Sequence, residues 1–507
     1  MTQQPLVTQA EPHFFDRRHG APPHDCRPWW QIVLAAAASG ALMAACYWPL
    51  HLHFLAWIAL VPWLYVMPGL SPRRTWLFGT VVGLVFYRIG LAWMFGLHGP
   101  LAGITIVGLA VWMGFSFRVA GMLIDRFGTA SMLWAVPLTF VGQEVLRSEA
   151  LPRFRFSFLA WGYSQSHNIW VAQIASVGGV YSLSFLLVMF SAAIAYASHS
   201  TNRRAWLLPT AVAGMVFLLA TVTQPHDDMS VRNTVAVACV QAETESYDTY
   251  ADLTHEALNN PCRPHIVVLP EHTIYDFADE RHALVVTLRE LAHTHGAFIC
   301  VGAHTRAPNT AECYYDNVAM LIGPDGHIVG QQAKAVPLPF FQDGNPARDQ
   351  ATTKTVYGTI GLCVCYDALF TDVPRRLVDL GAEVVLVPVM DPERWPEQER
   401  RQHADMAVLR SIELRRASVR AASSGVSQII DPTGQVQTQR SRTEGPGFVI
   451  GTVVFRAGRT LFVRGGYLFA PTLACTFLAV IGGLTIAQYA KDPKLIYRRP
   501  RPLPRSV

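Results

Sequence analysis

The chain has 507 residues, of which 51% are hydrophobic and 15% charged, so it is richer in apolar residues and poorer in charge than an ordinary soluble protein. The formal net charge is only +5 and much of the excess lies in short basic stretches, a pattern that excludes disordered and nucleic-acid-coating proteins. Nine cysteines, an odd number without a repeating spacing, argue against a disulfide framework.

Apolar windows of membrane-spanning length dominate the first half of the chain and return near its end. A helical span needs about 20 mostly apolar residues. The second window is short and interrupted by proline, and the fifth contains Glu144. We expect about eight transmembrane helices, at 30–48, 54–70, 76–97, 101–123, 129–147, 168–197, 205–222 and 467–488.

Arginine residues in the short connections predict the orientation of these helices. Positively charged flanks stay on the cytoplasmic side, and Arg73, Arg126 and Arg203 lie in alternate connections. The first span would itself serve as the targeting signal, because no apolar stretch precedes it. The predicted order is a cytoplasmic tail at 1–28, a membrane domain with seven helices at 29–222, an extracytoplasmic domain at 225–460, an eighth span at 467–488 and a basic cytoplasmic tail at 489–507.

The connection at 148–167 disagrees with this pattern. With Arg147, Arg153 and Arg155 in or beside it, it would lie outside despite its positive charge. It would then be folded into the headgroup layer, and whether it is a re-entrant arm stays open. The alternative topology has five or six spans and a cytoplasmic soluble domain.

Residues 225–460 change to short β-branched runs that alternate with helical stretches, which is typical of an α/β domain. Gly-Pro-Asp-Gly at 323–326 and Asp-Pro-Thr-Gly at 431–434 predict hairpin turns. Several strands are continuous apolar runs, so we expect a layered sandwich with sheets inside and helices outside. The predicted strands are 233–241, 265–270, 297–303, 317–322, 327–333, 354–366, 382–389, 426–431 and 447–455, and the predicted helices are 246–259, 279–295, 371–380 and 399–421.

Several common catalytic motifs are missing from the sequence. It has no Walker phosphate loop, no G-x-G-x-x-G after a strand and no H-E-x-x-H. A G-x-S-x-G nucleophile elbow is also absent. Nucleotide-binding, zinc-protease and common serine-hydrolase functions therefore lose their best support.

An acid, an amine and a thiol remain, each at the end of a predicted strand. They are Glu271, Lys334 and Cys365. A thiol needs a base to become a thiolate, and a carbonyl under attack needs a cation or N–H donors for its oxyanion. Each residue taken alone is more often a loop or core residue, but the three together fit nucleophilic acyl chemistry.

In these residues the chain resembles the nitrilase (carbon-nitrogen hydrolase) superfamily, whose members use a Glu-Lys-Cys triad in this chain order. The matching stretches are LPEHT, the lysine of QQAKAVPLPF, and CVCYD. Together with the membrane spans and the stretches at 144–165, 314–326 and 402–436, the chain looks like the bacterial apolipoprotein N-acyltransferase branch, whose nitrilase-like αββα sandwich is embedded in a helical membrane bundle.

This resemblance implies roles for individual residues. Glu271 would be the general base, Lys334 would stabilise the tetrahedral intermediate, and Cys365 would be the nucleophile, flanked by Tyr366. Cys363 is the rival nucleophile, because alternate strand residues share a face. The family's cysteine, however, directly precedes the aromatic-acid pair, which favours Cys365.

Three departures from the family pattern bear on the substrate. The family usually has Pro-Phe-Gly-Glu after its lysine, whereas here Phe340 is followed by Phe341 and Gln342, so the second glutamate is missing. Asp367 replaces the glutamate after the Cys-Tyr pair, and the loop at 389–395 is altered. Candidates for an acyl-facing apolar surface are Leu338, Phe340, Phe341 and Trp395.

The resembled reaction is a two-step acyl transfer at the outer face of the bacterial inner membrane. A phospholipid donates the acyl chain to the cysteine, and the α-amino group of an S-diacylglyceryl cysteine at the start of an apolipoprotein accepts it. No cofactor, metal or nucleic acid is expected. Two other functions stay open: a membrane-tethered amidase or acyltransferase with another amine acceptor, and a non-catalytic membrane scaffold.

Overall fold

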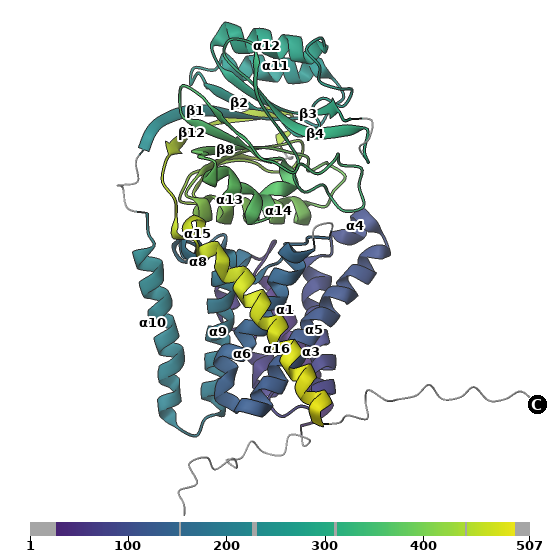
Figure 1. Ribbon diagram of the computed structural model, residues 1–507, viewed down its shortest axis with the longest axis vertical. Coiled ribbons are helices and arrows are strands. Elements are labelled where there is room, and N and C mark those ends of the chain that lie inside the picture. Colours follow the sequence, from purple (N-terminus) through teal and green to yellow (C-terminus); the bar gives the residue numbers. More distant parts are fainter. Residues whose placement is uncertain (1–26, 152–153, 226–230, 309–311, 442–443, 492–507) are drawn as a thin grey trace, which may run out of the picture.

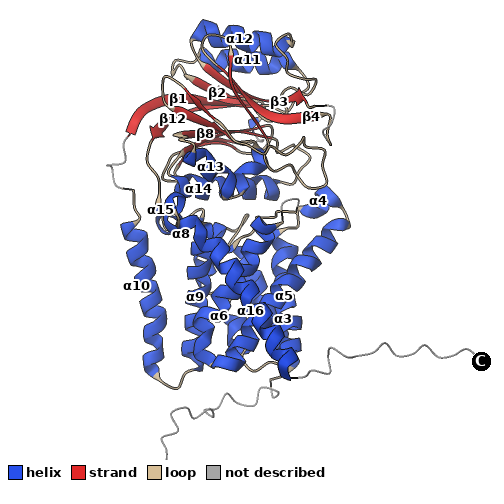
Figure 2. Cartoon of the chain, viewed as in Figure 1, coloured by secondary structure: helices blue, strands red, loops and turns tan. Residues whose placement is uncertain are grey.

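The structure is a computed structural model in which the described residues are 27–151, 154–225, 231–308, 312–441 and 444–491. The molecule has two parts, a bundle of helices and an α/β domain (Figure 1). The α/β domain lies on one end of the bundle. All the strands belong to the α/β domain (Figure 2). The predicted tails at 1–28 and 489–507 lie almost entirely outside the described residues.

The bundle is built from the N-terminal half of the chain and the last described helix. Short 3-10 helices and one π-helical turn, Leu146–Ala150, connect its members. The α-helices are α1 (Trp29–Ala45), α2 (Val61–Val66), α3 (Pro72–Gly90), α4 (Met94–His98), α5 (Leu101–Phe127), α6 (Met132–Val145), α7 (Ile169–Ala172), α8 (Ala175–Gly178), α9 (Val180–His199), α10 (Leu207–Val222) and α16 (Phe469–Lys491).

Within the described residues, four helical segments are long and apolar enough to cross a membrane: 101–127, 180–199, 203–222 and 466–488. The other predicted spans are shorter or more polar helices, so the count of eight is not established by helix length. The window at 168–197 is not one helix. It breaks at Gly179, whose φ of +74° favours glycine and whose missing side chain leaves room for Phe462 and Glu413.

Two of the long helices expose most of their surface. Less than a quarter of the apolar window is buried in the segments 203–222 and 466–488, which contain α10 and α16. Their exposed side chains include Phe217, Leu218, Leu478 and Ile486. A helix that is apolar on its outer face as well as its inner face is typical of a membrane span in contact with lipid.

Helices α3 and α5 approach each other through glycine. A Cβ added at Gly114 would lie 2.3 Å from Thr80 Oγ1 and 2.6 Å from the backbone oxygen of Trp76, and one added at Gly83 would lie 2.7 Å from the Cα of Ala110. Small residues at such contacts let backbones come close enough for tight van der Waals packing, which is the main attraction between helices in lipid.

The α/β domain contains two six-stranded sheets, ordered β12-β1-β2-β3-β4-β5 and β11-β10-β9-β8-β7-β6. Both sheets are mixed, with parallel pairs at their centres and antiparallel pairs toward their edges. The strands are β1 (Val231–Gln241), β2 (Ile266–Val268), β3 (Phe298–Arg306), β4 (Tyr315–Ile322), β5 (Ile328–Ala333), β6 (Thr352–Lys354), β7 (Thr359–Leu362), β8 (Val384–Val389), β9 (Ala417–Ala422), β10 (Ser427–Ile430), β11 (Val436–Arg440) and β12 (Gly447–Arg456).

Residue alternation in β1 defines the layers. Val237 and Cys239 join the core between the two sheets, whereas Ala238 and Val240 join a second core beneath the helices α11 (Tyr247–Leu258) and α12 (Ala283–His295). The helices α13 (Asp372–Asp379) and α14 (Glu397–Leu414) cover the other sheet and face the bundle (Figure 1). The predicted αββα sandwich is therefore present.

Two secondary-structure predictions in this domain are wrong in part. The predicted strand 354–366 is β6, a turn and β7, which ends at Leu362 before the cysteine. The predicted helix 399–421 ends at Leu414, because Arg415 adopts a left-handed conformation with φ of +54°. The following residues form β9, which pairs with β8 and β10, so tertiary pairing overrides the helical pattern there.

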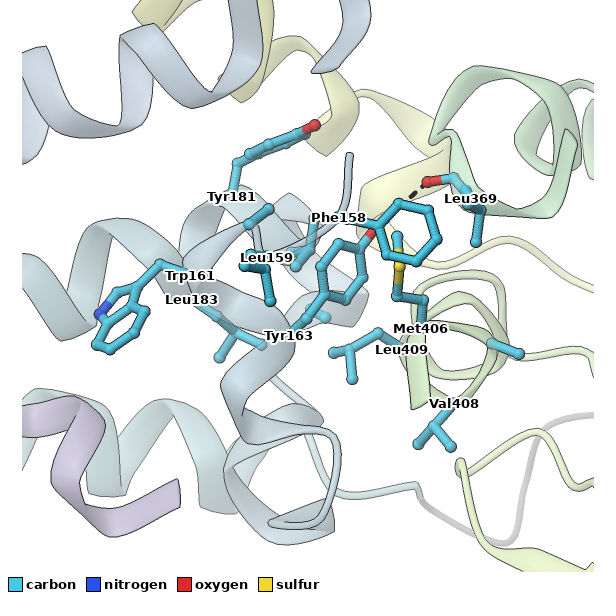
Figure 3. Packing of buried hydrophobic residues seen from close by; sticks show 14 of the residues in the cluster. Phe158, Leu159, Trp161, Tyr163, Tyr181, Leu183, Leu369, Met406, Val408 and Leu409 are labelled. Atoms are coloured by element: carbon cyan, nitrogen blue, oxygen red, sulfur yellow. Dashed lines mark hydrogen bonds between the residues drawn. The ribbon is translucent and has the colours of Figure 1, made fainter. Parts of the chain in front are cut away.

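The segment after the π-helical turn joins the two domains. Arg155 forms an ion pair with Asp372 at 2.8 Å, and Tyr163 donates a hydrogen bond to the backbone oxygen of Leu369 at 3.3 Å. Tyr163 lies among buried side chains from both domains (Figure 3). Arg147 donates to the backbone oxygens of Phe156 and Phe158. Two of the three discordant arginines therefore have protein partners, and Arg153 lies outside the described residues.

Replacing Gly114 by alanine is expected to destabilise the protein, because the new Cβ would force α3 away from α5. Overpacking of this kind typically costs about 1–3 kcal/mol. Gly108→Ala on the same helix is the matched control, since a Cβ there meets no atom within 4 Å. Thermal unfolding in detergent should give a lower Tm for Gly114→Ala only. Equal Tm values for the two variants would contradict the close helix contact.

Candidate active site

Three buried side chains of different chemistry meet between the sheets and the bundle. Glu271 follows β2, Lys334 directly follows β5, and Cys365 begins the 3-10 helix Cys365–Leu369 after β7. Their exposed fractions are 2% or less. The strands that precede these residues end at the same place, so the fold brings the three side chains together in one cluster.

Hydrogen bonds fix the carboxylate of Glu271 on both oxygens. Its Oε1 accepts from Lys334 Nζ at 2.8 Å and from Asn317 Nδ2 at 2.7 Å. Its Oε2 accepts from the backbone N–H of Met390 at 2.9 Å. The carbonyl oxygen of Met390 lies 4.0 Å from Cys365 Sγ. Met390 thus contacts the carboxylate through its N–H and the thiol through its carbonyl oxygen.

A second carboxylate holds the lysine. Asp343 Oδ2 lies 2.7 Å from Lys334 Nζ, and Asn317 Nδ2 donates to both Asp343 Oδ1 and Glu271 Oε1. Burial opposes the charge of Lys334, but Asp343 and Glu271 outweigh it and raise the lysine pKa well above its usual value. Burial likewise opposes the charge of Asp343, and Lys334 and His272 hold its pKa below the usual range. The lysine is therefore a permanent ammonium.

Asp343 corrects the expectation that the second acid of the lysine loop is missing. Gln342 occupies the position expected for it, but Gln342 is exposed and contributes only its backbone oxygen, which accepts from Tyr315. Asp343, the next residue, reaches the lysine instead. An acidic residue one position later in the sequence is the signal that sequence reasoning missed.

Cys365 has a strained backbone and a neutral thiol. Its φ of +46° is uncommon for a residue with a side chain, and strain of this kind clusters at functional sites. Burial raises the pKa of the thiol well above its usual value, Glu271 adds to this effect, and Lys334 opposes it. The thiol therefore needs a base before it can act as a nucleophile.

Cys363 differs from Cys365 in what it faces. Cys365 lines a cavity with a volume of about 770 Å³, whereas Cys363 lines a pocket of about 20 Å³ beneath α14. Burial also raises the pKa of the Cys363 thiol. Only Cys365 thus has space beside it for a substrate.

Asp367 ties the cysteine turn to the lysine loop. Its carboxylate accepts from the backbone N–H groups of Ala335 at 3.0 Å and Val336 at 2.7 Å. Burial raises the pKa of Asp367 to about 7, although the N–H donors and Lys334 act the other way. Tyr366 beside it donates to the backbone oxygen of Arg155 at 2.7 Å, which links the same turn to the bundle.

The large cavity extends from Cys365 into the helical bundle. Its wall is mostly apolar. Phe341 contacts Trp395, with ring centroids 6.3 Å apart, and Phe340 contacts Phe154. The lining residues include the predicted Leu338, Phe340, Phe341, Tyr366 and Trp395, together with Trp93, Leu97, Ile104, Leu109 and Trp112 of the bundle.

A further buried network near the thiol was not predicted. Asp391 Oδ1 lies 2.8 Å from His403 Nδ1, and Arg420 Nη2 donates to Asp391 Oδ2 at 2.6 Å. A thiol, carboxylate and imidazole atom from Cys365, Asp391 and His403 all lie within 4.8 Å of one another. Burial lowers the pKa of His403, and Asp391 acts the other way. The residues of this network come from separate stretches of the chain, and no motif in the sequence indicates that they meet.

Comparisons with known proteins match both parts of the chain. Residues 39–193 match the family model described as apolipoprotein N-acyltransferase N-terminal domain, and residues 235–456 match the carbon-nitrogen hydrolase model. Apolipoprotein N-acyltransferases from Geobacter metallireducens and Gloeobacter violaceus are each 26% identical to this chain, with 95% and 89% of this chain and 99% and 94% of theirs covered. A carbon-nitrogen hydrolase structure from Helicobacter pylori G27 is 16% identical, with a TM-score of 0.39, covering 53% of this chain and 100% of that one.

Asp343→Asn is expected to destabilise the protein, because it removes one of the two carboxylates that neutralise the buried Lys334. Breaking a buried ion pair from one side typically costs about 3–5 kcal/mol. Gln342→Glu is the matched control on the neighbouring exposed residue, with an expected change within about 0.5 kcal/mol. Chemical or thermal unfolding of both variants measures the difference. A stable Asp343→Asn variant would show that the lysine does not depend on this partner.

Proposed function

Because the chain belongs to the apolipoprotein N-acyltransferase branch of the carbon-nitrogen hydrolase superfamily, we propose that it acylates lipoproteins through a thioester on Cys365. The acyl donor is a phospholipid, and the acceptor is the α-amino group of the S-diacylglyceryl cysteine of an apolipoprotein. This proposal rests on the position of the Cys365 thiol. It lies beside the Lys334–Glu271 pair, at the end of an apolar cavity that enters the bundle.

In the first half-reaction Glu271 takes the proton of the Cys365 thiol. The thiolate attacks the ester carbonyl of the phospholipid, and the ammonium of Lys334 stabilises the oxyanion that develops. The intermediate collapses with cleavage of the ester C–O bond, and Glu271 returns the proton to the departing alkoxide. The products are a lysophospholipid and a thioester on Cys365.

In the second half-reaction the acceptor amine attacks the thioester carbonyl. Glu271 removes a proton from the attacking nitrogen, and Lys334 again stabilises the oxyanion. Collapse of the intermediate breaks the C–S bond, releases the amide product and returns the thiol. The same acid-base group serves both halves, which explains why its two oxygens are held by hydrogen bonds rather than left mobile.

The buried carboxylates around the lysine serve to position it. Asp343 neutralises part of the lysine charge and fixes its direction. Asp367 holds the lysine loop and the cysteine turn at a constant separation. Positioning to within fractions of an ångström is what an acyl transfer at a fixed thiol requires.

The cavity provides the binding energy for the acyl chain. Each CH₂ group that it removes from water contributes roughly 0.8 kcal/mol. An apolar, water-poor cavity also protects the thioester from hydrolysis. Phe340 and Phe341, at its rim near the bundle, are placed to cover the reacting end of the chain.

Placement at a membrane follows from the substrates. Both are anchored in lipid, so an active site at the end of a transmembrane bundle meets them in two dimensions. We propose that the bundle crosses the bacterial inner membrane eight times, with the shorter helices crossing beside the four long ones, and that the α/β domain lies on the periplasmic side. The arginine pattern of the short connections supports this orientation.

Incubation of the purified protein with phospholipid and no acceptor is expected to add one acyl group to the protein mass. Hydroxylamine should remove the adduct, because it cleaves thioesters. Cys365→Ala should abolish the adduct, and Glu271→Gln should slow its formation by at least about 10²-fold, the usual effect of losing a general base. Intact-mass spectrometry measures each result.

Cys363→Ala is the matched control for this experiment, because that thiol lies two residues away but outside the large cavity. It should keep the adduct. An adduct that survives Cys365→Ala, or no adduct with any phospholipid, would contradict the thioester mechanism. The membrane-tethered amidase and the scaffold would then become the better explanations.

Gln342→Glu is expected to leave the choice of acceptor unchanged, because Asp343 already supplies the acid of the lysine loop. The acyl-loaded protein should transfer its chain to a diacylglyceryl peptide equally well with and without the substitution. Ammonia and simple amines, offered at the same concentration, should remain poor acceptors for both. A change of acceptor in the variant would favour an acyltransferase with a different natural amine.

The orientation predicts which thiols a membrane-impermeant maleimide reaches in intact cells. Cys262 is exposed in the α/β domain and should be labelled from the periplasm. A cysteine introduced as Thr201→Cys, in the connection before α10, should react only after the inner membrane is permeabilised. A Cys262→Ser variant checks the assignment of the label. The reverse pattern would place the α/β domain in the cytoplasm.

A further inference from the structure

A cluster of two histidines and one aspartate lies at the junction of the domains, apart from the active site. His51 belongs to the connection after α1, His167 to the connection before α7, and Asp405 to α14. His167 Nε2 lies 3.0 Å from Asp405 Oδ1, and His51 Nδ1 lies 3.9 Å from Asp405 Oδ2. The cluster therefore joins two connections of the bundle to a helix of the α/β domain.

The donor atoms of this cluster suit a metal ion. One nitrogen of each imidazole and a carboxylate oxygen all lie within 4.8 Å of one another. The two rings meet edge to face, with centroids 4.1 Å apart. Zinc bonds of about 2.0–2.1 Å imply separations of about 3.3 Å between ligand atoms of a tetrahedral site. His167 Nε2 lies 3.0 Å from one carboxylate oxygen of Asp405 and His51 Nδ1 lies 3.9 Å from the other, so each imidazole faces its own oxygen at a comparable distance.

Two other clusters of comparable composition already contain a protein cation. Lys334 contacts both carboxylates of the cluster formed by Glu271, His272 and Asp343. Arg420 contacts Asp391 in the cluster beside Cys365. In the part of the chain that the structure describes, Asp405 forms no ion pair with a lysine or arginine. Each of its two carboxylate oxygens faces one imidazole nitrogen.

The cluster is accessible to an ion. The side chains of His51, His167 and Asp405 are 28%, 46% and 21% exposed. They line a groove of about 610 Å³ that has room for water as a further ligand. Arg401 lies on the same groove and opposes a cation, but its guanidinium pairs with Glu397 at 3.3 Å.

We propose that His51, His167 and Asp405 bind a divalent transition-metal ion of the zinc type, which fastens α14 to the bundle. Two imidazoles and a carboxylate, with water completing the shell, are ligands that zinc accepts. Asp405 lies two residues after His403, which lines the cavity with Cys365. Metal binding at the junction thus holds the helix that forms part of the active-site wall.

Titration of the detergent-purified, metal-stripped protein with Zn²⁺ tests this proposal. The protein should be purified without a histidine tag and carry Cys262→Ser and Cys475→Ser, because exposed thiols also bind zinc. Calorimetry should find one ion per chain, and Zn²⁺ should raise Tm. Binding should weaken as pH falls toward 5, because histidine must be neutral to bind a metal.

His167→Gln and Asp405→Asn should each weaken Zn²⁺ binding by more than about 100-fold, since the loss of an outer-shell partner alone costs roughly 10–100-fold. His327→Gln, at an exposed histidine of the β4–β5 turn, is the matched control and should bind normally. Far-UV circular dichroism and the Tm of each metal-free variant check that it is folded. No saturable binding by the starting protein, or undiminished binding by folded His167→Gln and Asp405→Asn variants, would overturn the proposal.

Discussion

The buried ammonium of Lys334 between two carboxylates is the interaction on which the rest of the site depends. A lone charge in this position would cost several kcal/mol, and Glu271 and Asp343 offset that cost together. Asn317 bridges the two acids, so neither can turn away from the lysine. The strand ends that carry these residues are thereby held together. The thiol lies near the ammonium of Lys334, whose position is fixed by its two partners.

The bundle and the α/β domain are joined so tightly that they form one core. Buried side chains run without interruption from the transmembrane helices to the space between the sheets. The segment 154–163 makes this junction with the helices α13 and α14, through Arg155 with Asp372 of α13 and Tyr163 with Arg410 of α14. The segment and α14 also line the cavity beside Cys365. The cavity therefore runs without a break from the bundle to the Cys365 thiol.

Local sequence patterns predicted much of this arrangement. Apolar windows and turns gave the long helices, most strands and both hairpins, because burial and turn chemistry act over a few residues. Glu271, Lys334 and Cys365 were found through strand-end positions and family motifs, and the structure brings them together. Asp343 was missed, because the family motif places the acid at the position of Gln342, one residue earlier in the chain.

The sequence by itself determined the two-part organisation and the sandwich class, and it selected Glu271, Lys334 and Cys365 as the proposed triad, since these rest on composition, periodicity and short motifs. Only the tertiary structure decided that 417–422 is a strand, that Cys365 rather than Cys363 faces the large cavity, and that Asp391, His403 and Arg420 gather beside it. Those outcomes depend on pairing and packing between segments far apart in the chain, and no local pattern records which distant partner a residue will meet.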